Sequence, residues 1–124
     1  MIDEVAQVLV CAAETAILPR FRRLTAGDVT EKGPGDLVTV ADREAEQLIS
    51  RGLREILDIL VVGEEAVAED PSLLAALGKQ ACRLVDPIDG TSNFVAGRCE
   101  YAVMAALLRG GKPVAGCVIA PSAS

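Results

Sequence analysis

The sequence predicts a mixed α/β (α+β) domain in which two N-terminal helices pack on a mainly antiparallel sheet. Two amphipathic helical segments lie in the first half of the chain, and short aliphatic strands that end in acidic residues follow them. The last third has two apolar runs on either side of Gly110-Gly111, a pattern typical of a β-hairpin. The 124 residues suffice for one domain of modest size.

Residues 3–18 predict the first helix, because apolar side chains recur every three or four residues there. Pro19 follows as a stop signal. The apolar stripe consists of Val5, Val8, Leu9, Ala12, Ala16 and Ile17. The stretch from Thr25 to Gly35 is polar and contains glycine and proline near its end, so it predicts a loop or a weak hairpin.

Residues 37–40 predict a short extended segment, and residues 41–57 predict the second helix. Thr39 and Asp42 have the spacing of a capping box at the start of this helix. The predicted buried face carries Ala45, Leu48, Ile49, Leu53, Ile56 and Leu57. The capping box by itself explains the presence of Asp42 at this position.

Four further strands follow along the chain. Residues 59–62 and 82–85 are short aliphatic runs, and a short helix is expected after Pro71, between them. Residues 101–108 and 113–119 predict the two strands of the final hairpin. This alternation of elements supports a layered domain without internal repeats.

Composition excludes several classes of function. The net charge is −6 and no basic run occurs, so a nucleic-acid groove is not expected. The chain has no histidine, which excludes Ser-His-Asp and Cys-His catalysis within it. Hydrolytic chemistry would therefore depend on carboxylates, hydroxyls, lysine or a metal ion. The hydrophobic fraction is 51% with only 2% aromatic residues, so aliphatic side chains and alanine must form the core.

Cysteine spacing and hydropathy predict a cytoplasmic protein with no membrane partner. The four cysteines are far apart and include no C-x-x-C pair, so we expect reduced, partly buried thiols that serve only core packing. They are Cys11, Cys82, Cys99 and Cys117. No apolar run approaches the roughly 20 residues that span a bilayer, and the acidic first residues do not resemble a signal peptide.

Acidic residues follow two of the predicted strands. Glu64 comes after residues 59–62, and Asp86 comes after residues 82–85. If the strands pair with like ends together, these carboxylates converge. A tight turn from Asp86 to Asp89, with φ fixed by Pro87, would aim both Asp side chains and the Ile88 carbonyl at one point. Hard cations such as Mg²⁺ prefer oxygen ligands of this kind, and paired metal ions support phosphoryl hydrolysis.

Gly90 and Thr91 extend this hypothesis from metal to phosphate. Glycine lets the backbone approach a ligand, and Thr91 could cap a short helix whose free N–H groups bind phosphate. Each piece also has a simpler interpretation: an isolated D-P-x-D-G is usually a turn, and Glu64-Glu65 is usually a solvated strand end. Lys32, in a Gly-Pro loop, is usually solvated as well.

The pieces together resemble the inositol monophosphatase family. The resemblance lies in DLVTVAD at 36–42, GEE at 63–65 and DPIDGTSNF at 86–94, which occur in the family's order. The third segment is highly specific, and the match extends over essentially the whole chain, hairpin included. The resemblance implies the layered αβαβα fold shared with fructose-bisphosphatases and a Mg²⁺-dependent, lithium-sensitive type of sugar phosphatase.

Roles for individual residues also follow from the resemblance. It implies that Glu64, Asp86, Asp89 and the Ile88 carbonyl bind Mg²⁺. Thr91, hydrogen-bonded to Asp42, would help to activate the attacking water. The Gly90 and Thr91 amides would hold the phosphate, with Glu64, Ile88 and Asp89 also near the substrate. Glu65 would lie behind the metal ligands, and Lys32 in the loop that approaches a metal in such enzymes.

The family places a further metal-binding Asp, in a W-D-x-A-like segment, in its second half. This chain has no Trp and no such segment. We therefore expect residues 1–124 to be the N-terminal part of a single domain, whose C-terminal half is absent, and which is a homodimer at full length.

The predicted activity is hydrolysis of a small phosphomonoester by metal-activated water, without a covalent intermediate. Inositol phosphate, histidinol phosphate and fructose bisphosphate are the candidate substrates, and DPIDGTSNF favours the first two over bisphosphate nucleotides. The fragment alone is expected to be inactive. The alternative is a non-catalytic or truncated fragment that binds metal and phosphate weakly.

Overall fold

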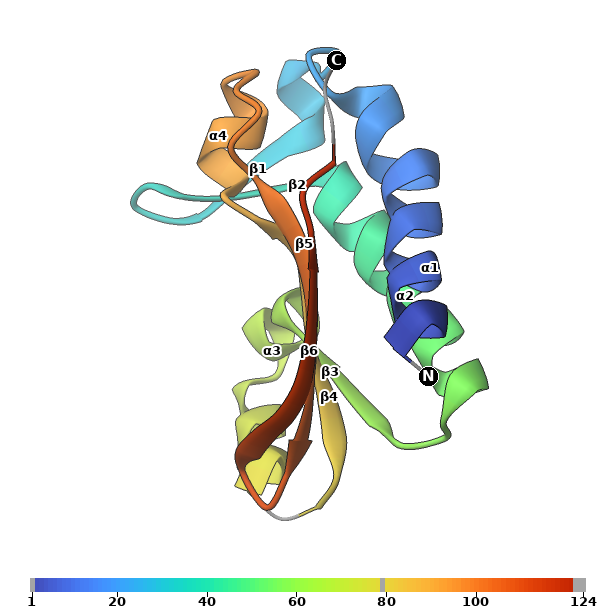
Figure 1. The fold of residues 1–124 in the computed structure, drawn as a ribbon. Coiled ribbons are helices and arrows are strands. Elements are labelled where there is room, and N and C mark those ends of the chain that lie inside the picture. The colour runs from blue at the N-terminus through green and yellow to red at the C-terminus, as the bar shows by residue number, and fades with distance from the viewer. Residues whose placement is uncertain (1, 79, 122–124) are drawn as a thin grey trace.

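The computed structural model describes residues 2–78 and 80–121 as a layered α/β domain (Figure 1). Its main sheet has the strand order β3-β4-β5-β6. These strands comprise Leu60–Gly63, Cys82–Asp89, Ala102–Arg109 and Lys112–Ile119. β3 and β4 are parallel, whereas β4–β5 and β5–β6 are antiparallel, so the prediction of a mainly antiparallel sheet is confirmed.

Two helices cover one face of this sheet, as the apolar stripes predicted (Figure 1). α1 spans Ile2–Ala12 and α2 spans Val40–Ile56. Their buried side chains form one core with those of β4 and β5, including Leu9, Ile49 and Val85. The absence of large aromatic side chains from both helices lets aliphatic residues and alanine fill this layer closely.

Helical structure continues past the end predicted for the first helix. A π-helical turn at Ala13–Ile17 and a 3₁₀ turn at Leu18–Arg20 extend it beyond Pro19. The prediction that Pro19 stops the helix was therefore wrong. Proline lacks an N–H group, but the first positions of a helical turn need no internal partner for that group, so Pro19 fits as the second residue of the 3₁₀ turn.

A small hairpin precedes α2, so the hairpin alternative for the Thr25–Gly35 stretch is confirmed. After a 3₁₀ turn at Ala26–Asp28, β1 (Val29–Gly33) pairs antiparallel with β2 (Asp36–Thr39). The predicted capping box then starts α2, and the Thr39 hydroxyl accepts from the Ala41 and Asp42 amides.

Two short helical segments lie between β3 and β4. α3 spans Glu64–Glu69, and the 3₁₀ segment η4 spans Pro71–Gly78, where a short helix was expected. β3 and β4 pair with like ends together, with Gly63 opposite Val85. The parallel pairing therefore places Glu64 and Asp86 at the same end of the sheet, as the sequence predicted.

The segment from Asp86 to Asp89 is not the tight turn that was predicted. It continues β4, with a register shift between these two residues where the strand pairs with β5. Pro87 lies within this irregularity, where a missing N–H group breaks no regular ladder. The chain turns one residue later, at Gly90, whose φ of 91° suits glycine.

The three aromatic residues of the chain form one cluster beside α4 (Thr91–Val95). Phe21, Phe94 and Tyr101 have ring centroids 5.1–5.8 Å apart. Phe94 is fully buried, and it fixes α4 against the core. A cluster from three separate segments thus supports the turn that carries Gly90 and Thr91.

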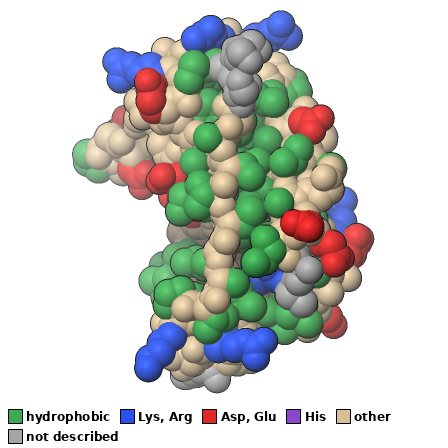
Figure 2. Space-filling model, in the orientation of Figure 1, with side chains coloured by type: hydrophobic (Ala, Val, Ile, Leu, Met, Phe, Trp, Pro, Cys, Tyr) green, Lys and Arg blue, Asp and Glu red, His purple; other side chains and the backbone are tan. Residues whose placement is uncertain are grey.

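The surface has mixed polarity. Hydrophobic side chains lie on both sides of the β6 backbone (Figure 2), where Val114 and Val118 are exposed. The four cysteines are free, but Cys11 and Cys99 are exposed, so the core-packing prediction was wrong for these two. Within residues 2–78 and 80–121, no helix has the length and apolar character needed to span a bilayer.

Candidate functional site

Most of the predicted site residues line one cleft at the end of β3 and β4. The cleft has a volume of about 240 Å³. Its walls are Gly35, Asp36, Leu37, Glu64, Asp86, Ile88, Asp89, Gly90, Thr91, Ser92 and Asn93. The surface is hollowed between the β1–β2 hairpin and α3, and acidic side chains lie at the edge of this hollow (Figure 2).

Glu64 and Asp86 are neighbours in the wall of the cleft. Burial raises the pKa of Glu64 to about 7, and a hydrogen bond shared with Asp86 and repulsion from its charge add to this effect. Burial also raises the pKa of Asp86. Two carboxyl groups at this spacing cannot both ionise freely unless a positive charge joins them. The pair therefore has the electrostatics of a cation site.

One further observation fits a cation. The Oδ1 atom of Asp86 is buried and has no hydrogen-bond partner in the described part of the chain. Buried carboxylate oxygens normally have a partner, and a metal ion can be that partner. Glu64 and Asp86 would hold the cation from two sides, and Asp89 lines the same cleft.

The full predicted ligand set is not drawn together. Among the described residues, no three Asp, Glu, His or Cys side chains lie close enough to hold a metal ion. Asp89 is exposed, and the Ile88 carbonyl accepts a hydrogen bond from the Thr91 hydroxyl at 3.1 Å. Of the four predicted ligands, Glu64 and Asp86 lie together. Asp89 and Ile88 line the wall of the same cleft.

Asp42 has two distinct functions in the fold, one for each carboxylate oxygen. Oδ2 accepts from the Thr39 amide at 2.8 Å and from the Thr39 hydroxyl at 2.7 Å, which completes the capping box. Oδ1 accepts from the Thr91 hydroxyl at 3.0 Å, across 49 positions of the sequence. Capping therefore does not account for Asp42 completely, because a second oxygen is directed at the cleft wall.

Thr91 is not the helix cap that the sequence suggested. Gly90 is the N-cap of α4, and Thr91 is its first helical residue. The Thr91 hydroxyl lies within hydrogen-bonding distance of both Asp42 Oδ1 and the Ile88 carbonyl, but it has one proton to donate. A side chain added at Gly90 would approach the Glu100 carbonyl to 2.9 Å, so glycine is required there.

Glu46 is a site residue that the sequence analysis missed. It is 8% exposed, and its carboxylate accepts from the backbone amides of Glu65 and Ala66 at 2.7 and 2.9 Å. It thereby caps the start of α3, whose first residue is Glu64. A Cβ atom at Gly63 would overlap the Glu46 carboxylate. The available signal was an acid four residues after Asp42, among the apolar positions of the same helix face.

Lys32 and Glu65 form an ion pair behind the central acids. The Lys32 ammonium group donates to the Glu65 carboxylate at 3.2 Å and lies 3.8 Å from Glu64 Oε1. Glu65 is buried, and with Lys32 it lines a neighbouring pocket that also includes Asp36. The structure thus places Lys32 close to the acids instead of in open solvent, and Glu65 behind Glu64.

The fold and the acidic cleft define a class of layered α/β protein with a carboxylate-lined site at a strand end. Comparison with known proteins identifies the family. The model of the inositol monophosphatase family matches residues 1–124, so the chain belongs to that family. The resemblance seen in the sequence is confirmed.

Two curated relatives show how the family varies. The chain is 31% identical over 119 residues to a fructose-1,6-bisphosphatase/inositol-1-monophosphatase of Aquifex aeolicus, covering 95% of this chain and 43% of that protein. It is 37% identical over 122 residues to the 3'(2'),5'-bisphosphate nucleotidase CysQ of Shigella flexneri, covering 98% and 48%. The chain therefore spans less than half the length of these relatives.

Solved structures support the fold. The inositol monophosphatase of Thermotoga maritima has a TM-score of 0.76 and 28% identity, over 95% of this chain and 43% of that one. The extragenic suppressor protein SuhB of Bartonella henselae has a TM-score of 0.69 and 37% identity, over 94% and 44%. These matches confirm the predicted mixed α/β fold class.

Proposed function

We propose that the chain supplies the metal-binding and water-activating half of a Mg²⁺-dependent phosphomonoesterase. The observation that carries this proposal is the contact between Glu64 and Asp86, together with the unpartnered Oδ1 of Asp86. These groups, with Asp89 and the Ile88 carbonyl at the cleft wall, would hold the cation. When bound there, Mg²⁺ supplies activation of water and neutralises charge on the phosphoryl group.

Residues of this chain would accept the proton that the attacking water loses. Thr91 donates to Asp42 Oδ1, so its hydroxyl oxygen can accept a proton from water in the cleft while its own proton passes to Asp42. Burial raises the pKa of Asp42, so its carboxylate is a better proton acceptor than an exposed one. Asp42 Oδ2 stays engaged by Thr39, which fixes the orientation of the carboxylate during the transfer.

The phosphate would lie against the turn after β4. Gly90 and Thr91 line the cleft, and Gly90 has no side chain to block the approach of a phosphate to the backbone. Glu64 and Ile88 border the same space. No basic side chain lines this cleft among the described residues, so the cation must balance most of the charge of the phosphate.

The substrate class is a small phosphate ester, with inositol phosphate, histidinol phosphate and fructose bisphosphate as candidates. The relatives' names include a bisphosphatase and a bisphosphate nucleotidase. Nucleotide bisphosphates should therefore be assayed too, although the DPIDGTSNF segment favours inositol phosphate and histidinol phosphate. The chain would form the N-terminal part of one domain, in a homodimer at full length. Its C-terminal half would supply the remaining ligand and the surfaces that select the substrate.

Two measurements test the proposal. In the 124-residue chain, calorimetric titration with Mg²⁺ or Mn²⁺ should show saturable binding that the Asp86→Asn, Asp89→Asn double variant loses. In a form extended to the length of the relatives, phosphate release should depend on added Mg²⁺. Unchanged metal binding by the double variant would contradict the site, and binding without turnover in the extended form would favour a non-catalytic metal-binding role.

A further inference from the structure

A second buried charge without a partner lies on β4, away from the cleft. Arg83 is 4% exposed, and it is three residues before Asp86 on the same strand. Because side chains alternate along a strand, Arg83 points to the opposite face of the sheet, toward the helix layer. Its position between Cys82 and Leu84 carried no functional signal in the sequence.

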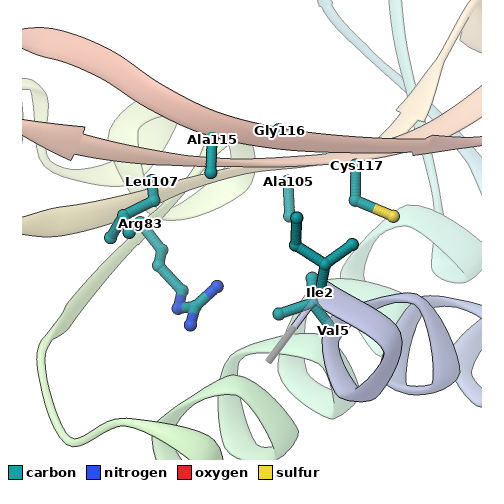
Figure 3. A pocket seen from close by; sticks show the side chains of 8 residues that line it. All are labelled: Ile2, Val5, Arg83, Ala105, Leu107, Ala115, Gly116 and Cys117. Atoms are coloured by element: carbon teal, nitrogen blue, oxygen red, sulfur yellow. The ribbon is translucent and has the colours of Figure 1, made fainter.

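The guanidinium group of Arg83 enters a small, otherwise apolar cavity. The cavity has a volume of about 30 Å³ and is bordered by Ile2 and Val5 of α1 and by side chains of β5 and β6. Figure 3 shows the guanidinium group pointing from β4 into the space beneath the sheet, with Ile2 and Val5 across from it. The walls other than Arg83 offer no charged side chain.

Two guanidinium nitrogens, Nε and Nη2, are buried without a hydrogen-bond partner among the described residues. No ion pair of the described residues involves Arg83 either. These two N–H groups lie side by side on one edge of the guanidinium plane. That edge is the fork that binds both oxygens of a carboxylate in parallel.

Deprotonation does not relieve the cost of burying the Arg83 charge. Burial lowers the pKa of Arg83, but a guanidinium group stays protonated at neutral pH. A buried ionised group without a counter-charge is strongly unfavourable. A cavity of about 30 Å³ has room for about two or three water-sized atoms, since roughly 10–15 Å³ holds one. The upper end of this range matches the two oxygens and one carbon of formate.

We propose that the Arg83 cavity is a binding site for a small carboxylate anion of formate size. The anion binds in parallel to Nε and Nη2 and locks α1 onto the sheet through its contacts with Ile2 and Val5. This site is separate from the cleft, because Arg83 and Asp86 point to opposite faces of β4. It does not depend on the proposed phosphatase function.

The direct test is a formate titration of the 124-residue chain at constant ionic strength, followed by NMR of the arginine Nε–H resonances. The Arg83 resonance, identified by its loss in Arg83→Lys, should move to a saturating value, while the resonances of the other arginines stay in place. Citrate, which is too large for the cavity, should leave the Arg83 resonance unchanged. No saturable shift, or an equal response to citrate, would overturn the proposal.

Thermal melting gives an independent measurement. For a Kd of about 1 mM, about 20 mM formate should raise the Tm of the parent by about 5 °C. Arg83→Met should lose this response, and Arg109→Met, which removes an exposed arginine, should keep it. An equal formate response in Arg83→Met and the parent would mean a general salt effect and no site. If Arg83→Met does not fold, the resonance titration of the parent decides.

Discussion

Buried acids occur in two regions of this molecule, and their surroundings differ. On α2, Asp42 and Glu46 have backbone or hydroxyl donors for both carboxylate oxygens. At the strand ends, Glu64 and Asp86 interact with each other, and one oxygen of Asp86 has no partner among the described residues. Lys32 lies 3.8 Å from Glu64, but the pKa of Glu64 stays raised despite this charge.

This difference separates two uses of a carboxylate. A carboxylate with all its donors stabilises the fold, whereas a pair of carboxylates without sufficient positive charge requires an external cation. The α2 acids hold the strand-end segments in place, Asp42 through Thr91 and Glu46 through the start of α3. One helix thus aligns the two segments that carry the central acids.

The largest effect expected from this comparison is on metal affinity. Asp86→Asn removes the charge of the carboxylate whose oxygen lacks a partner. We expect Mg²⁺ affinity to fall by about 100-fold or more, beyond the ~10–100-fold typical of losing an outer hydrogen-bond partner. Calorimetric titration measures this, and Asp58→Asn, at an exposed site, is the control. Equal losses in both variants would mean that the effect is a general loss of negative charge and that Asp86 holds no cation.

The next effect concerns catalysis by the extended form. In Asp42→Asn, the amide oxygen can still accept from Thr39, but the amide nitrogen would then face Thr91 and donate to it. The Thr91 hydroxyl would then donate to the Ile88 carbonyl, 3.1 Å away, and it could no longer pass its proton to a carboxylate. We expect kcat to fall by roughly 100-fold with stability nearly unchanged.

Thr39→Ala is the matched control for Asp42→Asn. It removes the capping hydroxyl and should cost about 1 kcal/mol of unfolding free energy. The Thr39 backbone amide still holds Asp42 Oδ2, so kcat should stay close to that of the parent. Kinetics and urea unfolding of both variants separate the two oxygens of Asp42. A kcat near the parental value in Asp42→Asn and also in Thr91→Ala would mean that the pair takes no part in proton transfer.

A smaller effect tests the support that Glu46 gives to Glu64. Glu46→Ala leaves two amides of α3 without an acceptor and should cost about 1–3 kcal/mol of unfolding free energy. Gly63→Ala should destabilise the parent, because its Cβ overlaps the Glu46 carboxylate, but much less in the Glu46→Ala background. A double-mutant cycle by urea unfolding measures the coupling. If the losses of unfolding free energy in the two single variants simply add in the double variant, Glu46 and residue 63 do not interact.

The smallest effect is the pH dependence of stability in the metal-free chain. The pKa of Glu64 is raised from 4.5 to about 7 on folding, so the folded state binds more protons than the unfolded state between these values. Stability from this group is therefore present at low pH and is lost as pH rises from about 4.5 to about 7.

Saturating Mg²⁺ should reverse this loss, because the cation replaces the proton between Glu64 and Asp86. Thermal melts at several pH values, with and without Mg²⁺, measure both effects. Glu64→Gln should flatten the dependence in the metal-free chain. A slope that Glu64→Gln leaves unchanged would assign the pH dependence to other acids and contradict the role given to Glu64.

Local sequence was enough for much of the fold. Apolar periodicity located α1 and α2, and Gly110-Gly111 located the hairpin, because each signal depends on residues close in the chain. The acids after β3 and β4 converge only if these strands pair with like ends together, and the sequence left that pairing as a condition, which the structure meets. The irregular end of β4 could not be predicted in this way, since its path depends on pairing with β5.

By itself, the sequence determined the family and the identity of the acids, since three short segments in order carry that information. Only the tertiary structure decided how each acid is used. Asp42 reaches Thr91 across 49 positions, Glu46 reaches the start of α3 across 19, and Arg83 is buried by α1 and the hairpin. Whether a buried charge has a partner depends on segments distant in the chain, and no local pattern records their approach.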